Sequence, residues 1–448
     1  MDDRLQQLTE ALLRAARQAG ATAADAMAVD GTAISVDVRQ GRLEQAERAE
    51  GIEIGLRVLI GQRQACVSAS DTSARTIGDM AERAVAMARE APADDSIGLA
   101  DPADLARNWD TAALELSDPT PDALATDLEA DARRAEAAAF AVKGISQVDS
   151  ASASYGRRRI HMMASNGFSG GYERTSRSIS AVAITGEGLG MERDWAAESR
   201  AFQADLPAPE DVGRLAGQRT VERAGAQKPV TGGYPVLFDE RIAGSLIGHI
   251  LSAANGSSVV RGASWLRDAL GGQILPAGLS ITENPHRPRL SGSRPFDAEG
   301  LPTMARDIVA GGVLTGWTLD LGTARRLGMK STGSASRSAA AAPVPGNGNI
   351  ALTQGQKSRA DLLADMGTGL LVTGFLGASI NPTTGDYSRG VSGFWVENGQ
   401  ISFPVNECTI AGNLRDMLMR IVPANDARTH LSLVVPSLLV EGLTLAGQ

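Results

Sequence analysis

Side chains that bind metals or act as nucleophiles are few in this sequence, and they are widely spaced. A hydrolytic zinc ion needs a near-tetrahedral set of His, Cys, Asp or Glu ligands, with one position left open for water. No two histidines or cysteines stand at ligand spacing; the residues concerned are Cys66, His161, His249, His286, His430 and Cys408. The spacing predicts that His249 is a packed or surface histidine. His286 lies between two prolines, so we expect it in a loop.

Two short glycine motifs match functional patterns only formally. Residues 167–171 read Gly-Phe-Ser-Gly-Gly and satisfy G-x-S-x-G with Ser169. That pattern exposes a nucleophile only where a strand turns sharply into a helix, whereas the alternation of residues 172–184 predicts a strand, and therefore a hairpin turn. Residues 186–190, Gly-x-Gly-x-Gly, are one residue short of the dinucleotide fingerprint and lack a surrounding βαβ unit. An active hydrolase with an unrecognised site stays an alternative, in which Ser169 or His249 would be essential.

A strand followed by a helix stands at the centre of the chain. Residues 234–238, Tyr-Pro-Val-Leu-Phe, are apolar and precede Asp239, whose side chain can accept hydrogen bonds from the free N–H groups of the next helix. The apolar face of that helix repeats at helical spacing through Ile242, Leu246, Ile247 and Ile250.

The first half of the chain alternates helices with antiparallel hairpins. The opening helix ends where Gly20 can adopt the left-handed conformation, and residues 52–58 alternate as a half-buried strand does. Further strands are expected at residues 33–39 and 64–70. Further helices are expected at residues 73–90, from Thr120-Pro121 onward, and at residues 209–224.

The second half carries many short strands with glycine turns, together with helices such as 265–270 and 358–366. Residues 333–348 are mostly Ser, Ala, Pro and Gly, which predicts a mobile loop. We expect an α+β fold in two domains, because 448 residues exceed one ordinary core. Residues 1–226 would form an N-terminal domain of helices and antiparallel hairpins. Residues 227–448 would form a curved or barrel-like antiparallel sheet with helices.

Composition restricts the partners and the compartment. The formal charge is −9, from 52 acidic and 43 basic residues, which disfavours nucleic acid, and the basic residues 157–159 are interpreted as a solvated strand face. There is no run of 18 apolar residues, and the opening MDDRLQQL is no secretory signal, so no membrane is expected. Two distant cysteines fit a reducing compartment, and the cytoplasm is the predicted location.

Several long segments resemble one known family. They are PFDAEGLPT (295–303), ARRLGMKSTG (324–333), DMGTGLLVT (365–373), TGDYSRGVSGFWVENGQI (384–401) and CTIAGNL (408–414). The chain resembles the TldD/PmbA family of intracellular metallopeptidases, once called modulators of DNA gyrase. Catalytic members carry His-Glu-x-x-x-His at the start of the central helix, and those positions here are Glu240, Arg241 and Ser245. The family's C-terminal Gly-Thr-Cys-Gly segment reads Thr-His-Leu-Ser-Leu-Val at 429–434, without cysteine.

The resemblance implies the PmbA/TldE-type subunit, which lacks the zinc motif. It implies that this chain holds no cofactor and pairs with a zinc-bearing TldD-type chain that cleaves or processes unfolded peptides. Substrates would enter as extended strands through a channel, which the loop after Thr332 and glycine-rich strands would line. A homodimer of the isolated chain is left open, and a regulator that binds another protein such as DNA gyrase is a second alternative.

Peptide- or partner-binding residues are predicted beside the hairpin near the C-terminus. They are Asp386, Tyr387, Ser388, Arg389 and Asn413. The alternative interpretation is that these side chains hold loops together through hydrogen bonds to the backbone.

Overall fold

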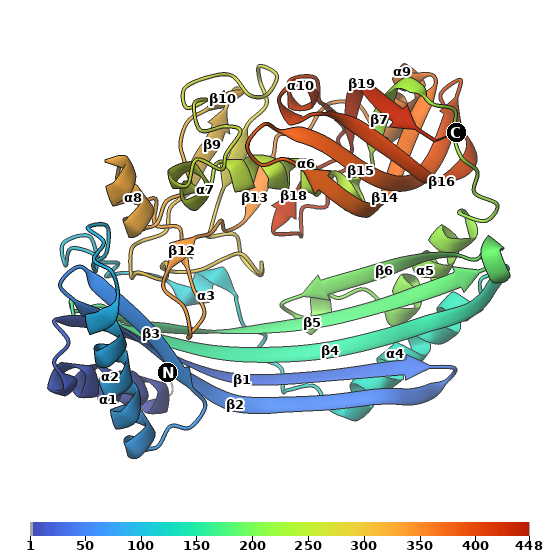
Figure 1. Ribbon diagram of the computed structural model, residues 1–448. Helices are drawn as coiled ribbons and strands as arrows, with labels where there is room; N and C mark the ends of the chain where they lie inside the picture. The colour runs from blue at the N-terminus through green and yellow to red at the C-terminus, as the bar shows by residue number, and fades with distance from the viewer. Residues whose placement is uncertain (1–2, 448) are drawn as a thin grey trace.

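The computed structural model describes residues 3–447 and places a six-stranded antiparallel sheet in the N-terminal half (Figure 1). The strand order is β3-β2-β1-β4-β5-β6. The strands are β1 (Ala23–Arg39), β2 (Arg42–Ile60), β3 (Arg63–Ala69), β4 (Ile145–Ala164), β5 (Ser169–Thr185) and β6 (Glu192–Arg200). The helices of this half are α1 (Asp3–Ala19), α2 (Ala74–Glu90), α3 (Thr111–Leu114), α4 (Ala125–Phe140) and α5 (Pro209–Val221), with 3-10 turns η1 (Gly188–Gly190) and η2 (Gln203–Asp205).

Local sequence signals account for much of this half. Gly20 has a φ of 100° directly after α1, as the predicted left-handed helix end requires. Ile54, Leu56 and Val58 are fully buried and pack with residues of α1 and α2, which confirms the predicted strand. The predicted half-buried alternation is wrong, because Gly55 and Arg57 on the opposite face are buried as well. The strands are longer than predicted, since β1 begins at Ala23 and β2 at Arg42.

A closed five-stranded barrel dominates the C-terminal half. Its strands are β7 (Gly232–Phe238), β14 (Gly369–Ile380), β15 (Asp386–Glu397), β16 (Gln400–Asn413) and β19 (Leu438–Ala446), and the pairing of β16 with β19 closes it. The predicted barrel-like sheet is confirmed, with one departure: β7 and β14 run parallel. Helix α6 (Glu240–Ala253) follows β7 and buries Leu246, Ile247 and Ile250 in the same core as the barrel interior.

A second sheet adjoins the barrel in the order β10-β9-β8-β13-β18. Its strands are β8 (Ile281–Glu283), β9 (Arg306–Ala310), β10 (Val313–Leu314), β13 (Ile350–Leu352) and β18 (Leu433–Val434). The remaining elements are α7 (Gly256–Val260), α8 (Leu321–Leu327), α9 (Arg359–Met366), α10 (Leu414–Leu418), β11 (Ala335–Ser336), β12 (Val344–Pro345) and β17 (Val422–Pro423).

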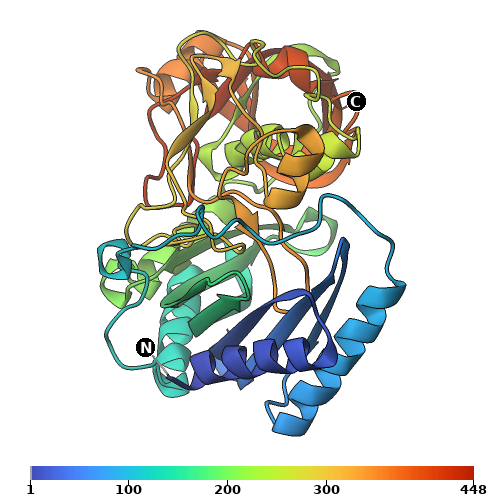
Figure 2. The ribbon, with the colours of Figure 1, turned by 90° about the vertical axis from the view of Figure 1, so that its left-hand side faces the viewer.

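The prediction of a mobile loop at 333–348 is wrong. The segment is a hairpin of β11 and β12 that reaches down to the N-terminal sheet (Figures 1 and 2). Arg337 pairs with Asp25 of β1, and Ala339 is 4% exposed. Contacts with a distant part of the chain order the segment, and its composition gives no sign of them.

The helix predicted from Thr120 is present but begins later, and the helix predicted at 265–270 is absent, because hydrogen bonds to other segments hold the backbone. The carboxylate of Asp118 accepts from the N–H groups of Thr120 at 2.9 Å and Gln203 at 2.7 Å, and α4 begins only at Ala125. Residues 265–270 form turns, where the N–H of Trp265 donates to the carbonyl of Pro382 at 2.8 Å.

The two halves lie face to face. Helices α1, α2, α4 and α5 cover one face of the N-terminal sheet, and the C-terminal half lies over the opposite face (Figure 2). The predicted boundary near residue 226 falls between α5 and β7. Within residues 3–447, no helix is long and apolar enough to cross a bilayer.

Candidate functional site

The start of α6 lies at the contact between the two halves, and Arg241 is paired there with carboxylates. Asp239 caps the helix by accepting from the N–H of Arg241 at 3.1 Å. The Arg241 guanidinium lies 3.4 Å from the Asp239 carboxylate and donates to Asp194 of β6 at 3.2 Å. Arg223 and Arg359 approach the same two carboxylates. Arg241 therefore links α6 to the N-terminal sheet.

Glu240, the first helical residue, takes part in a second set of ion pairs. Its carboxylate accepts from Arg428 at 2.8 Å, and Arg428 also donates to Glu198 of β6 at 3.2 Å. His430 lies 3.5 Å from Glu198, which also accepts from Arg200 at 2.7 Å. Burial and then the charge of Arg200 lower the pKa of His430, so its imidazole is neutral at neutral pH.

These residues do not fit a hydrolytic zinc site. The guanidinium of Arg241 repels a cation, Glu240 is committed to Arg428, and the buried Ser245 hydroxyl has no hydrogen-bond partner in the described chain. Across residues 3–447, no group of three or more His, Cys, Asp or Glu is arranged to hold a metal ion.

Two of the predicted binding residues are joined to each other. Asp386 of β15 is the cross-strand partner of Asn413 of β16, whose amide donates to the Asp386 carboxylate at 3.1 Å. Asp386 also accepts from the Thr384 hydroxyl at 2.6 Å, and Asn413 caps α10 by accepting from the N–H of Arg415. Hydrogen bonds from Thr384 and Asn413 lower the pKa of Asp386. These contacts fasten a turn and a helix start.

The other three predicted residues lie farther along β15. Tyr387 is 2% exposed in the barrel core, its ring centroid is 5.9 Å from that of His249, and its hydroxyl has no hydrogen-bond partner within the described residues. Arg389 stacks 3.7 Å from the centroid of Phe375. Ser388 is half-buried opposite Ala411. Burial raises the pKa of Tyr387 to about 12, so the phenol stays protonated.

A groove of about 480 Å³ separates the N-terminal sheet from loops of the C-terminal half. Arg158 of β4 and Arg174 of β5 belong to its floor. Arg200 of β6, Arg289 and His430 also line it, together with hydroxyl-bearing residues such as Ser432. Neither Asp nor Glu occurs among the described residues that line this groove, so every ionisable side chain in its lining is an arginine or a histidine.

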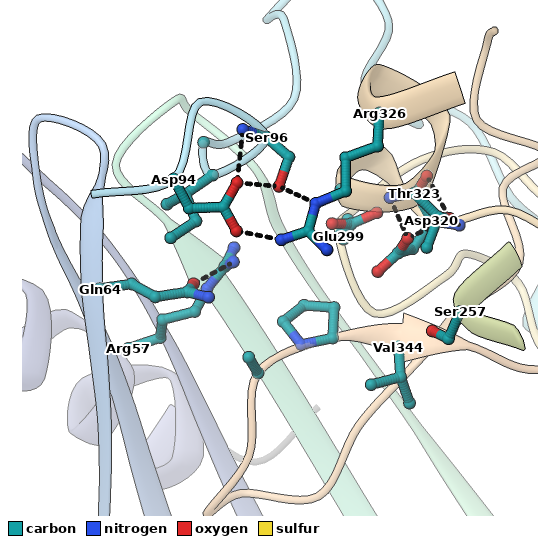
Figure 3. Close-up of a pocket in the computed structure, with 15 residues that line it drawn as sticks. Arg57, Gln64, Asp94, Ser96, Ser257, Glu299, Asp320, Thr323, Arg326 and Val344 are labelled. Carbon is teal, nitrogen blue, oxygen red and sulfur yellow. Dashed lines mark hydrogen bonds and ion pairs between the residues drawn. The ribbon is translucent and has the colours of Figure 1, made fainter. Parts of the chain in front are cut away.

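A smaller pocket of about 170 Å³ lies at another part of the contact between the halves (Figure 3). Arg326 of α8 reaches across it to Asp94 and donates to the Ser96 hydroxyl at 3.1 Å. On the C-terminal side lie Glu299 and Asp320, and Asp320 accepts from the Thr323 hydroxyl at 2.6 Å. The pocket thus brings several carboxylates together with arginines.

Family models match nearly the whole chain. Residues 24–88 match a model described as PmbA/TldA metallopeptidase domain 1, residues 93–224 the central domain, and residues 231–447 the C-terminal domain. The chain belongs to the PmbA/TldD family.

Relatives of similar length agree with this assignment. Metalloprotease PmbA of Escherichia coli O157:H7 is 38% identical over 93% of this chain and 90% of its own length. The PmbA homolog of Haemophilus influenzae is 36% identical over 100% of this chain and 97% of its own. A candidate DNA gyrase modulator from Bacteroides thetaiotaomicron has a crystal structure with a TM-score of 0.91 at 27% identity, covering 100% of both chains. TldE of Thermococcus kodakarensis shares the fold, with a TM-score of 0.84 at 18% identity over 98% of this chain and 100% of its own.

Sequence reasoning about this PmbA/TldD family member missed the groove and the pocket. The basic residues 157–159 were visible, but only the structure separates them: Arg157 lies 2.6 Å from Asp122 and Arg159 lies 2.8 Å from Glu173, whereas Arg158 lines the groove. Ser169 stands at the predicted hairpin turn, where it pairs with Met163 of β4. Nothing local in the sequence brings Glu299 near α8, because the chain folds back over distant segments.

Glu299 gives this family member a testable pH dependence. Burial, followed by the negative charge of Asp297, raises the pKa of Glu299 to about 8. The folded chain then keeps a proton that the unfolded chain loses near pH 4.5, so stability falls as pH rises from there to about 8. Glutamine imitates the protonated acid and can still accept from the N–H of Leu321, which now donates to Glu299 at 2.8 Å. Glu299→Gln should therefore raise the melting temperature at pH 9 by about 2 °C or more relative to the natural chain.

The control is Asp94→Asn in the same pocket. Hydrogen bonds from Ser96 lower the pKa of Asp94, so this variant should give no gain at pH 9. Melting curves from pH 5 to pH 9 measure both. If Glu299→Gln changed the melting temperature by the same amount at pH 5 and at pH 9, the protonation state assigned to Glu299 would be wrong.

Proposed function

We propose that this chain is the non-catalytic, PmbA/TldE-type subunit of a two-subunit zinc metallopeptidase that degrades or processes unfolded peptides. A TldD-type chain with an intact His-Glu-x-x-x-His motif would hold the zinc and carry out hydrolysis. The present chain would shape the peptide channel and order the partner's active site.

The observation that carries this proposal is the set of ion pairs at the start of α6. The positions of the family's zinc motif are Glu240, Arg241 and Ser245, and the first two join α6 to β6 and to the segment before β18. Side chains that fasten the two halves together cannot also offer a free ligand set to a metal. We infer a supporting role for this helix in place of a catalytic one.

The groove between the halves supports the peptide-handling part of the proposal. β6 is an edge strand of its sheet, and groove residues Ser199 and Arg200 lie at its end. A strand edge offers free N–H and C=O groups to an extended peptide, and such recognition depends little on side chains. Unfolded peptides are the substrate class that this geometry suits.

The test is reconstitution. The purified chain, supplied with zinc, should hold zinc below one per monomer and hydrolyse no unfolded peptide above the background without enzyme. Mixing it with a TldD-type chain from the same genome should give hydrolysis, and a partner with glutamine in place of the motif glutamate should not. Zinc content is measured by elemental analysis and hydrolysis by mass spectrometry. One tightly held zinc per monomer with peptidase activity of the chain alone would refute the proposal.

Other outcomes would favour the two alternatives. Loss of an activity of the isolated chain in Ser169→Ala or His249→Ala would favour a hydrolase with an unrecognised site. Recovery of DNA gyrase but no TldD-type chain in a pull-down would favour a regulatory role. Size-exclusion chromatography of the isolated chain decides whether it forms a homodimer. The two free cysteines, Cys66 and Cys408, favour a reducing compartment, and we propose the cytoplasm.

A further inference from the structure

Two arginines stand directly opposite each other on the floor of the groove. Arg158 of β4 and Arg174 of β5 are cross-strand partners in the antiparallel register, and both line the groove. Like charges at directly opposed positions of two strands destabilise the pairing. The combined positive charge of the two arginines is therefore expected to serve a function other than stability.

No carboxylate of the described residues neutralises this pair. In the part of the chain that the structure describes, Arg158 is exposed and its side chain forms no ion pair or hydrogen bond. Arg174 donates to the backbone carbonyls of Ser291 and Ser293, at 3.0 and 2.6 Å, and lies 5.7 Å from the centroid of Tyr172. Neither contact supplies negative charge, although the Arg174 contacts do fix the position of its guanidinium.

The other cations of the groove are already paired. Arg200 donates to Glu198, and Arg289 binds Glu115 at 2.8 Å and Asp205 at 3.0 Å. His430 faces Glu198 and is neutral at neutral pH, because burial and then Arg200 lower its pKa. Within residues 3–447, the positive charge of the groove that has no carboxylate partner is therefore concentrated at Arg158 and Arg174.

We propose that the groove binds acidic peptide segments, with a peptide carboxylate held between Arg158 and Arg174. Arginines are the preferred partners of carboxylates, and the guanidinium of Arg174 is already held in position. Nearby hydroxyls such as those of Ser176 and Ser432 can add hydrogen bonds. The carboxylate comes from an Asp or Glu side chain or from the C-terminus of the peptide. The inference rests on the proposed peptide-handling function and names its substrate class.

The test is calorimetric titration of the full chain, without partner or zinc, with three N-acetylated peptides of equal length. The first contains glutamate and ends in an amide, the second has glutamine at the same positions and ends in an amide, and the third is the glutamine peptide with a free carboxylate. We expect the first to bind about tenfold more tightly than the second at low salt, and this preference to shrink as salt is added. Tight binding of the third would identify the peptide terminus as the source.

The preference should disappear in the double variant Arg158→Gln, Arg174→Gln. The single variant Arg158→Gln removes an exposed side chain that has no partner among the described residues. It should therefore keep the fold and its melting temperature while losing most of the preference. Arg267→Gln is the matched control, because Arg267 is exposed, pairs with Asp268 and is not among the groove residues. This variant should keep the preference for the glutamate peptide. Equal binding of all three peptides, or an unchanged preference in the double variant, would overturn the inference. Failure of reconstituted hydrolysis would instead count against the proposed function.

Discussion

Replacing Asp25 with asparagine is expected to lower the free energy of unfolding by about 3 to 5 kcal/mol. Asp25 of β1 stands opposite Arg57 of β2 and accepts from its Nε at 2.6 Å, and Arg337 of the β11–β12 hairpin binds the second carboxylate oxygen. The three side chains are between 1% and 8% exposed. Asparagine would leave two buried guanidinium groups side by side without a counter-charge.

The pKa of Asp25 fits this expectation. Burial alone would raise it, but the charges of Arg337 and Arg57 outweigh burial and lower the pKa below its ordinary value of 3.8. A carboxylate with a lowered pKa contributes stability that is present above the unfolded value and is lost as pH falls through the folded value. The stability difference between the natural chain and Asp25→Asn should therefore shrink below about pH 4.

Arg337→Met is the informative control, because the cluster carries one excess positive charge. Removing Arg337 leaves a balanced pair of Asp25 and Arg57, so this variant should cost clearly less than Asp25→Asn. Urea unfolding measures both, and limited proteolysis within residues 333–348 reports whether the hairpin has left the sheet. Equal losses in the two variants would mean that the charge balance does not control stability here.

Local signals in the sequence were sufficient for the central strand and helix. The apolar run before Asp239 forms β7, Asp239 caps α6, and Ile250 is buried, because capping and amphipathic spacing act over a few residues. The same kind of signal predicted that Ile54 and its neighbours form a strand, which is β2. The barrel was predictable as a class of fold, but its closure through β16 and β19 was not, since it joins strands far apart in the chain.

The parts that sequence reasoning missed are those determined by distant contacts. Residues 333–348 look disordered by composition, yet Arg337 is buried against Asp25, which stands more than 300 positions earlier in the chain. The pairing of Arg158 with Arg174 depends on the register of a hairpin with strands of 20 and 17 residues, and one residue of slip would place other side chains together. At the start of α6, the family resemblance was sufficient to identify Glu240, Arg241 and Ser245. The ion pairs that Glu240 and Arg241 form with other segments became visible only in the structure.

Gly55→Ala is expected to displace the β11–β12 hairpin from the N-terminal sheet through steric overlap. A Cβ atom at Gly55 of β2 would lie 2.0 Å from the carbonyl oxygen of Ala339 and 2.6 Å from its carbonyl carbon. The obstructing atoms belong to the backbone, so no side-chain rotation can relieve the overlap, and truncating Ala339 to glycine should not rescue the variant. Overpacking of this kind costs about 1 to 3 kcal/mol.

Gly51→Ala is the matched control for Gly55→Ala. Gly51 lies on the same strand β2, a Cβ atom there meets nothing within 4 Å, and its backbone is not left-handed. The control should change stability by no more than about 0.5 kcal/mol. Urea unfolding compares the two variants, and proteolytic cleavage within residues 333–348 should accelerate only for Gly55→Ala. If Gly51→Ala and Gly55→Ala have the same effect, the β11–β12 hairpin does not pack against β2 in solution. The contact of Arg337 with Asp25, and with it the cluster of Asp25, Arg57 and Arg337, would then be wrong as well.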